Sequence, residues 1–339
     1  MPGSPAGPPG PSSFEPSVLE LTVPVKEPLP VILNPAASGG AGRRLKREVE
    51  EELRQRGVEF RMSLTEGPGH ATTLAEEAAR RGAERILAVG GDGTVHEVVN
   101  GILRTPSDPP SLAVVPVGTG NDFYRMVGPR RRAEAALDAV TRGRTRRFDV
   151  GWVRFDGGES HFVNLLGVGV DVELLRRRNG FRHLRGLPQY LAALVSALVR
   201  FRPEALRVTL HQKGEEGEVF QDRTILSAVT VGPSVAGGFM LNPRALPDDG
   251  LLDLFFVRRL GMARIARYIP RVIRGTHEGI PEIRQRQIRE AVMERPDGGT
   301  FYFEMDGELV PHPTRRLEIG IREKTLPVLV PATGPSALG

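Results

Sequence analysis

The sequence predicts a two-part fold in which an α/β unit is followed by an antiparallel β unit. Three observations support it: 339 residues suffice for two hydrophobic cores, short apolar runs alternate with helical periodicity up to about residue 146, and strand-like runs dominate beyond it. With 40% hydrophobic and 26% charged residues, the composition is that of a globular protein. Fibrous and wholly disordered chains are therefore excluded.

Residues 1–28 have the composition of an unfolded tail. Residues 1–30 contain nine of the 29 prolines, together with several glycines and serines. Such a segment cannot bury enough apolar surface to fold. We therefore expect ordered structure from Leu29 onward.

Strands and helices alternate in the first unit. The pattern predicts strands at 31–33, 58–64, 85–89 and 112–115, and helices at 43–56, 70–81, 95–103 and 133–140. Glycine-rich turns follow three of these strands, at 34–42, 90–94 and 116–121. Because the carboxyl ends of parallel strands share one edge of a sheet, where such folds bind ligands, the three turns predict one site.

The second unit is rich in strands. Its expected strands lie at 148–155, 161–167, 205–212, 224–231, 251–257, 287–294, 300–305 and 315–321. Helices are expected only at 188–200 and 262–274. Strands that follow one another with few helices between them favour an antiparallel sheet.

The run Gly90-Gly91-Asp92-Gly93-Thr94 directly follows an expected strand and precedes an expected helix. Glycines let a backbone approach a phosphate closely, a helix N-terminus supplies free N–H groups, and Thr94 adds a hydroxyl. An aspartate in such a place favours a magnesium-bound nucleotide or a hydroxyl that loses its proton. The same run also fits a simple helix-capping turn, but the companion turns at 34–40 and 116–123 favour the ligand site.

Several chemistries are excluded by what the sequence lacks. There is no cysteine, so disulfides, zinc-thiolate sites and thiol nucleophiles are ruled out. The Walker pattern, the Gly-x-Gly-x-x-Gly fingerprint and the His-Arg-Asp catalytic loop do not occur. These absences disfavour P-loop enzymes, ordinary dinucleotide-binding proteins and protein kinases.

The three turns, taken with 164–171, 237–238, 246–253 and 305–308, resemble the diacylglycerol kinase catalytic-domain family, most closely its bacterial soluble lipid kinases, which are relatives of the sphingosine kinases. The resemblance runs from about Val31 to Val330. It implies a Rossmann-like α/β nucleotide domain, similar to that of NAD kinase and phosphofructokinase, and a C-terminal antiparallel β-sandwich, with the active site in the cleft between them. The implied domains are residues 29–146 plus 318–332, and residues 147–317.

The resemblance also implies the reaction, which is transfer of the γ-phosphoryl group of ATP, with Mg²⁺, to the hydroxyl of a diacylglycerol-like or sphingoid lipid. It places the following residues at nucleotide-binding positions: Asn34, Pro35, Ala36, Ala37, Ser38, Thr65, Gly90, Gly91, Asp92, Gly93, Thr94, Val95, His96, Thr119 and Asp122.

The acidic run Asp306-Gly307-Glu308 resembles the family's catalytic pair. The resemblance implies that one carboxylate accepts the proton of the lipid hydroxyl, and Glu308 is the favoured one, with Asp306 beside it. Asp92 remains a rival, because sphingosine kinases use the aspartate of their glycine motif. A structural Mg²⁺ is implied at spacing i, i+3, i+5 by the carbonyls of Leu246 and Leu251 and the carboxylate of Asp249, a ligand set that suits a hard cation.

The expected partners are ATP and a lipid acceptor. Net charge is +5. A basic run, Arg176, Arg177, Arg178, Arg182 and Arg185, precedes the apolar helix at 190–199, and arginines recur through 264–274. This pattern fits either an anionic membrane surface or solvated arginines on helices packed against the second unit. We expect no nucleic-acid partner and leave a homodimer open. The alternatives are a kinase of a soluble acceptor, as in NAD kinases, and a non-catalytic lipid or nucleotide sensor.

No stretch of the sequence is long enough to span a membrane. The longest apolar run, at 191–199, is about half of the ~18 residues that a spanning helix needs. The first residues lack the basic start and apolar core of a secretory signal. We therefore expect a cytoplasmic protein, with peripheral binding at the inner membrane face as a hypothesis.

Overall fold

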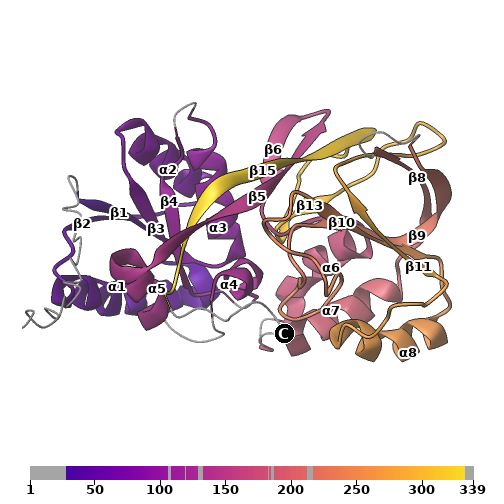
Figure 1. Ribbon diagram of the computed structural model, residues 1–339. Helices are drawn as coiled ribbons and strands as arrows, with labels where there is room; N and C mark the ends of the chain where they lie inside the picture. Colours follow the sequence, from indigo (N-terminus) through magenta and orange to yellow (C-terminus); the bar gives the residue numbers. More distant parts are fainter. Residues whose placement is uncertain are drawn as a thin grey trace, which may run out of the picture.

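The computed structural model describes residues 28–105, 108–118, 120–128, 133–181, 183–184, 187–211 and 217–332, without the side chains of residues 38–43 and 179. The predicted tail therefore lies outside the described residues, apart from residue 28. Two halves lie side by side, joined by two long strands (Figure 1). No helix in the described ranges has the length and apolar character needed to cross a bilayer.

The first half is the predicted parallel α/β unit. Its strands are β1 (Leu29–Leu33), β2 (Phe60–Leu64), β3 (Arg85–Gly90) and β4 (Ser111–Pro116), and its helices are α1 (Ala37–Gln55), α2 (His70–Arg80), α3 (Asp92–Ile102), α4 (Asp122–Val127) and α5 (Ala133–Arg142). The strands pair in parallel in the order β4-β3-β1-β2. Helix α1 contacts α5, and α2 contacts α3. Strands β1, β3 and β4 are buried on both faces, which explains their continuous apolar sequences, whereas the edge strand β2 is partly exposed.

The second half is the predicted antiparallel unit. It contains β5 (Arg144–Phe155), β6 (Gly158–Phe162), β7 (Leu165–Gly169), α6 (Val170–Arg178), the short 3-10 helix η1 (Asn179–Phe181), α7 (Leu187–Leu198), β8 (Glu204–His211), β9 (Val219–Thr230), β10 (Leu252–Arg258), α8 (Met262–Ile273), β11 (Ile283–Ile288), β12 (Glu290–Glu294), β13 (Glu304–Met305), β14 (Glu308–Leu309) and β15 (Arg316–Val330). One hydrophobic cluster fills its β structure, and a second joins the sheet to α6, α7 and α8.

Strands β5 and β15 connect the halves. They pair with each other in antiparallel fashion over most of their length, and β15 also pairs with β12 at one end and in parallel with β4 at the other. The predicted domain limits at residues 146 and 318 fall inside these strands. Their register shifts between Arg322 and Leu326, where Lys324 has a φ of 48°.

Several element boundaries were predicted wrongly. Helix α1 begins at Ala37, within the predicted turn at 34–42, and α3 begins at Asp92, within the predicted turn at 90–94. The strands expected at 161–167 and 287–294 are each divided, into β6 and β7 and into β11 and β12, and only Glu304–Met305 of the strand expected at 300–305 forms one. Helices α4 and α6 were not predicted.

Candidate active site

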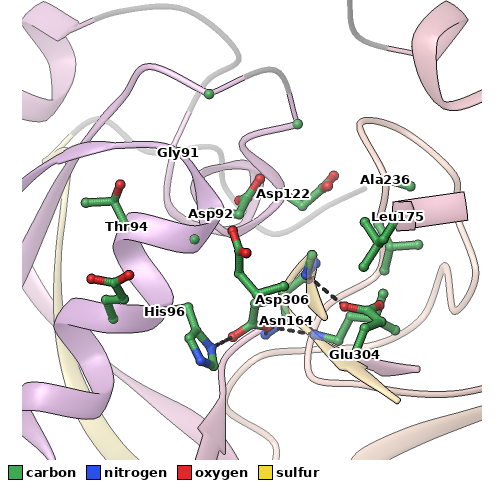
Figure 2. A pocket seen from close by; sticks show the side chains of 18 of the residues that line it. Gly91, Asp92, Thr94, His96, Asp122, Asn164, Leu175, Ala236, Glu304 and Asp306 are labelled. Atoms are coloured by element: carbon green, nitrogen blue, oxygen red, sulfur yellow. Dashed lines mark hydrogen bonds and ion pairs between the residues drawn. The ribbon is translucent and has the colours of Figure 1, made fainter. Parts of the chain in front are cut away.

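A cleft of about 1390 Å³ lies between the halves. Its walls come from the carboxyl ends of β1 to β4, the first turns of α3, helices α6 and α7, and the β13–β14 turn. Figure 2 shows Gly91, which follows β3, and Asp92, the first residue of α3. They face carboxylates and apolar side chains from the second half. Pockets for one small ligand usually measure roughly 300–1,000 Å³, so this cleft has room for two.

The three predicted turns meet at one end of the cleft. The side-chain amide of Asn34 donates to the Thr94 hydroxyl at 3.1 Å, which ties the first turn to the start of α3. A Cβ at Gly91 would lie 3.0 Å from the Cα of Gly118, so the second and third turns approach as closely as glycine allows. The first N–H groups of α3 have no acceptor within the helix and can bind an anion.

Most of the predicted nucleotide-binding residues border this cleft. They are Asn34, Pro35, Ala36, Ala37, Thr65, Gly91, Asp92, Gly93, Thr94, His96 and Asp122. Val95 instead packs in the core with 2% of its surface exposed, and Gly90 lies in β3 beneath the side chain of Thr94. Thr119 and the side chain of Ser38 lie outside the described part of the chain.

Asp92 and Asp122 form an acidic pair beside the turns. Burial raises the pKa of Asp92 to about 6, and the nearby charge of Asp306 adds to this. Burial and the charge of Asp92 raise the pKa of Asp122 to about 7. Asp122 accepts a hydrogen bond from the backbone N–H of Gly237 at 2.9 Å and lies 3.4 Å from the Nε of Arg125. Two buried carboxylates held together in this way suit a divalent cation.

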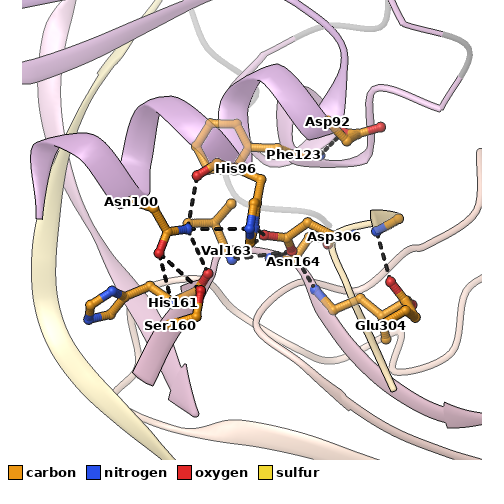
Figure 3. Close-up of polar contacts among 12 residues, drawn as sticks. Asp92, His96, Asn100, Phe123, Ser160, His161, Val163, Asn164, Glu304 and Asp306 are labelled. Atoms are coloured by element: carbon orange, nitrogen blue, oxygen red, sulfur yellow. Dashed lines mark hydrogen bonds and ion pairs between the residues drawn. The ribbon is translucent and has the colours of Figure 1, made fainter. Parts of the chain in front are cut away.

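Asp306 is held at both carboxylate oxygens. Its Oδ1 accepts from the backbone N–H groups of Asn164 at 2.8 Å and Leu165 at 3.0 Å, and its Oδ2 accepts from Val163 at 3.0 Å and from the Nδ1 of His96 at 2.8 Å (Figure 3). Asp306 has a φ of 51°, a conformation that a non-glycine residue rarely adopts. With both of its oxygens held by these donors, this carboxylate orders the surrounding backbone.

Glu308, unlike Asp306, has no fixed partner in the part of the chain that the structure describes. Its side chain lies against Gly93 at the start of α3, and it accepts no hydrogen bond from the residues that the structure describes. The protein atoms around it raise the pKa of its carboxyl, and the charges of Arg178 and His96 oppose that increase. Glu308 is therefore the carboxylate of the predicted pair that is free to take a proton in the cleft.

A second acidic pair, Asp171 and Glu304, was not predicted. The Oδ2 of Asp171 is buried without a hydrogen-bond partner among the described residues, and burial raises the pKa of this residue to about 7. Glu304 has 2% of its surface exposed, and burial together with the charge of Asp171 raises its pKa well above the ordinary value. Both carboxyls crowd Gly167 and border the cleft. The only sequence signal was that Asp171 ends the family-like series 164–171.

Arg178 is a cation among these carboxylates. It borders the cleft, donates to the Tyr190 hydroxyl at 3.0 Å, and lies over the Tyr190 ring at 5.6 Å. Its charge acts to lower the pKa of both Glu304 and Glu308. From the sequence it was predicted only as part of a basic run.

The other end of the cleft is apolar. Its lining includes Leu165, Val170, Leu174, Leu175, Leu194, Leu226, Val235, Phe239 and Leu241. These side chains come from the cluster that α6 and α7 form with the sheet. One end of the cleft therefore suits phosphate groups and the other suits hydrocarbon. Between these ends lie both acidic pairs, as well as Glu308 and Arg178.

The predicted metal loop connects β9 to β10. Asp249 accepts the backbone N–H of Leu251 at 3.0 Å, and burial raises the pKa of Asp249 above its usual value. Nearby, the Oδ2 of Asp253 is buried without a partner among the described residues, and burial raises the pKa of Asp253 to about 7. An uncompensated carboxylate beside a second one fits a hard cation, although no group of three or more metal-binding side chains occurs in the described ranges.

Known proteins match both halves of this arrangement. A profile of the diacylglycerol kinase catalytic domain matches residues 28–153, and a profile of the YegS C-terminal NAD kinase beta sandwich-like domain matches residues 164–330. The diacylglycerol kinase of Bacillus subtilis (strain 168) is 33% identical over 249 residues, covering 73% of this chain and 79% of the relative. That of Mycobacterium tuberculosis (strain ATCC 25618 / H37Rv) is 30% identical over 268 residues, covering 78% and 84%.

A solved structure extends the comparison to the whole fold. A Bacillus anthracis str. Sterne protein, provisionally described as a diacylglycerol kinase, superimposes with a TM-score of 0.71 at 25% identity, covering 90% of this chain and 97% of that one. The chain belongs to the diacylglycerol kinase catalytic-domain family, and the predicted α/β plus β-sandwich fold is confirmed. Members of this family are lipid kinases, so the protein is an enzyme of that kind.

Proposed function

We propose that the protein transfers the γ-phosphoryl group of ATP to the hydroxyl of a membrane lipid, with a diacylglycerol-like or sphingoid acceptor. The observation that carries this proposal is the single cleft that joins a glycine-lined helix N-terminus to an apolar pocket. The relatives named diacylglycerol kinase support the same acceptor class.

The nucleotide would bind at the three turns. Because Gly91 and Gly118 carry no side chains, phosphate oxygens could approach the backbone there, and the first N–H groups of α3 could bind them. Asp92 and Asp122 would hold the Mg²⁺ that accompanies ATP, and this ion would neutralise charge on the phosphates. Because a cation favours ionised carboxylates, its binding would lower the raised pKa values of this pair.

Glu308 would act as the base. The acceptor hydroxyl gives its proton to the Glu308 carboxylate while its oxygen bonds to the γ-phosphorus, and the bond from that phosphorus to the oxygen bridging it to ADP breaks. Asp306 would position the turn that carries Glu308, because its carboxylate is already bound to three backbone N–H groups and His96. Asp92 is the less favoured base, since its Oδ1 accepts from the Phe123 backbone at 3.2 Å.

The acceptor would enter from the apolar end. Its hydrocarbon would lie among Leu174, Leu175 and Leu194, and its polar end would reach Asp171 and Glu304. The Oδ2 of Asp171, for which the described residues supply no partner, could accept a hydrogen bond from a hydroxyl or an ammonium group of the lipid. This pair therefore favours an acceptor with a second hydrogen-bond donor near the reacting hydroxyl.

A second Mg²⁺ would have a structural role in the loop between β9 and β10. The carbonyls of Leu246 and Leu251 and the carboxylate of Asp249 would hold it. The Asp253 Oδ2, which has no partner among the described residues, lies nearby. Asp149 already fixes this loop, since its Oδ2 accepts the Gly250 N–H at 2.7 Å.

The enzyme would work in the cytoplasm, where ATP is available, and would bind peripherally to anionic membrane that contains its acceptor. The arginine-rich helices of the second half support this. The domain division at residues 146 and 318 remains a proposal too, with the nucleotide on the first domain and the lipid on the second.

The test is transfer of labelled γ-phosphate from Mg²⁺-ATP into organic-extractable product. Mixed micelles would carry diacylglycerol, monoacylglycerol, sphingosine, ceramide or phosphatidylglycerol, one at a time. Glu308→Gln should reduce the rate by about 10²–10⁴-fold, the usual contribution of a general base. The matched control is Glu290→Gln, which changes an exposed carboxylate on β12.

Label in at least one lipid, lost in Glu308→Gln and retained in Glu290→Gln, would support the proposal. Full activity in Glu308→Gln would exclude Glu308 as the base, and loss in Asp92→Asn with Mg²⁺-ATP binding intact would then assign the base to Asp92. No label in any lipid, with ATP binding intact, would favour a soluble acceptor or a sensor.

A further inference from the structure

We infer that the outer faces of α7 and α8 form the surface by which this protein docks on an anionic bilayer, beside the apolar end of its cleft. The inference rests on the proposed lipid acceptor and names the membrane-binding face that this acceptor requires. The docking face is defined as Val195, Val199, Arg200 and Arg202 from α7 and the residues after it, with Met262, Arg267 and Arg274 from α8 and its C-cap.

Helix α7 has two different faces. Tyr190 and Leu194 line the cleft, whereas Val195 and Val199 point away from it, with 52% and 69% of their surfaces exposed. The two valines are one helical turn apart and form a continuous apolar strip. Helix α7 is thus the wall between the acceptor pocket and the surroundings, with apolar side chains on both sides.

Helix α8 adds to the same surface. Figure 1 shows α7 and α8 near each other at the lower side of the second half, and both pack on one hydrophobic cluster. None of the α8 residues is fully buried, and Met262 at its start has 48% of its surface exposed. Because Ile265 and Ile269 pack inward, the arginines of α8 lie on its outer side.

The four arginines of the docking face are unpaired among the described residues, whereas Arg264 on the same helix pairs with Glu282. No acidic residue occurs from Leu184 to Pro203 or from Arg258 to His277. Within the described ranges, the side chains of Arg200, Arg202, Arg267 and Arg274 form no ion pair or hydrogen bond. Unpaired cations keep their full attraction for an anionic surface, and exposed aliphatic side chains between them can enter the headgroup region.

Several arginines on the β structure are neutralised instead. Arg154, Arg207 and Arg316 each pair with a glutamate on a neighbouring strand. The chemistry of the docking face therefore fits phospholipid headgroups, and its position allows a lipid to pass along α7 into the cleft.

The experiment measures sedimentation with vesicles of phosphatidylcholine alone or with about one-third phosphatidylglycerol. The charge variant is Arg267→Gln with Arg274→Gln, and the apolar variant is Val195→Gln with Val199→Gln. The matched control, Arg61→Gln with Arg315→Gln, removes two exposed arginines from β2 and from the segment before β15, away from the docking face.

Wild type and control should bind the anionic vesicles alike. The charge variant should bind about 30-fold more weakly, because each basic residue near an anionic surface contributes about fivefold. Both docking-face variants should lose activity on vesicle lipid and keep it on a dispersed short-chain acceptor. Wild-type binding by both docking-face variants would overturn the inference. Failure of the proposed function would instead be the absence of label in every lipid, a result that leaves the binding measurement intact.

Discussion

The Nδ1 of His96 donates a hydrogen bond of 2.8 Å to the Oδ2 of Asp306 across the cleft. The two residues lie 210 positions apart in the sequence, one on α3 and the other in the β13–β14 turn. This bond fixes the nucleotide-side helix to the turn that carries Glu308. The distance between the phosphate end and the free carboxylate therefore depends on it.

We predict that His96→Phe lowers the free energy of unfolding by about 1–3 kcal/mol, the cost of leaving a buried acceptor with one donor fewer. It should also lower kcat, because the turn that carries Glu308 loses an anchor. Urea unfolding and steady-state kinetics measure these two effects. In the double variant His96→Phe with Asp306→Asn, the loss of unfolding free energy should be smaller than the sum of the two single losses. Strictly additive losses would contradict a direct interaction between the two residues.

We predict that Arg178→Met shifts the acidic limb of the kcat profile to higher pH. The charge of Arg178 acts to lower the pKa of Glu308, so removing it should raise that pKa and delay ionisation of the base. The matched control is Arg176→Met, since Arg176 is exposed and pairs with Glu173. An unchanged acidic limb in Arg178→Met would argue against Glu308 as the group that titrates.

We predict that the metal-free protein loses stability as pH rises from about 4 to about 7. The pKa of Asp122 is about 7 in the folded chain and near 3.8 in the unfolded chain. The unfolded state therefore ionises first and is favoured over that interval, by about 1.4 kcal/mol per pKa unit at most. Urea unfolding at pH 5 and pH 8 should show a smaller difference for Asp122→Asn than for wild type.

We predict that Leu175→Trp raises the KM for long-chain acceptors by tenfold or more and leaves the KM for ATP unchanged. Leu175 borders the apolar end of the cleft, so a larger ring there would occupy the volume of several methylenes. Activity on a series of chain lengths measures this effect, with Val219→Trp on an exposed strand end as control. Equal losses for short and long chains would show that the pocket does not hold the chain.

The sequence predicted the sheet and its site edge because strand ends and turns are local features. Asn34, Gly91 and Gly118 each follow a strand, and their meeting follows from parallel pairing alone. The start of α1 was missed because Gly39, Gly40 and Gly42 lower helix propensity, whereas Val49 and Leu53, both buried, anchor the helix further along. Tertiary burial thus outweighed a local preference.

The contacts that complete the candidate site are long-range and had no local signal. The predicted strand is interrupted between β6 and β7. There the N–H groups of Val163, Asn164 and Leu165 donate to Asp306, which lies more than 140 residues later in the sequence. The pairing of Asp171 with Glu304 likewise needs β7 beside β13. Only the assembled sheet shows which buried acids lie together.

The paired strands β5 and β15 have a further consequence. They are the two covalent connections between the halves, so the cleft can change its width only if this ribbon bends or twists. Its irregular point is at Lys324, whose N–H donates to the buried Asp149 at 2.6 Å, and the same carboxylate binds Gly250 in the proposed metal loop. Bending of the ribbon at Lys324 would therefore pull on a loop outside the active site, and an ion held in that loop would stiffen the ribbon at this point.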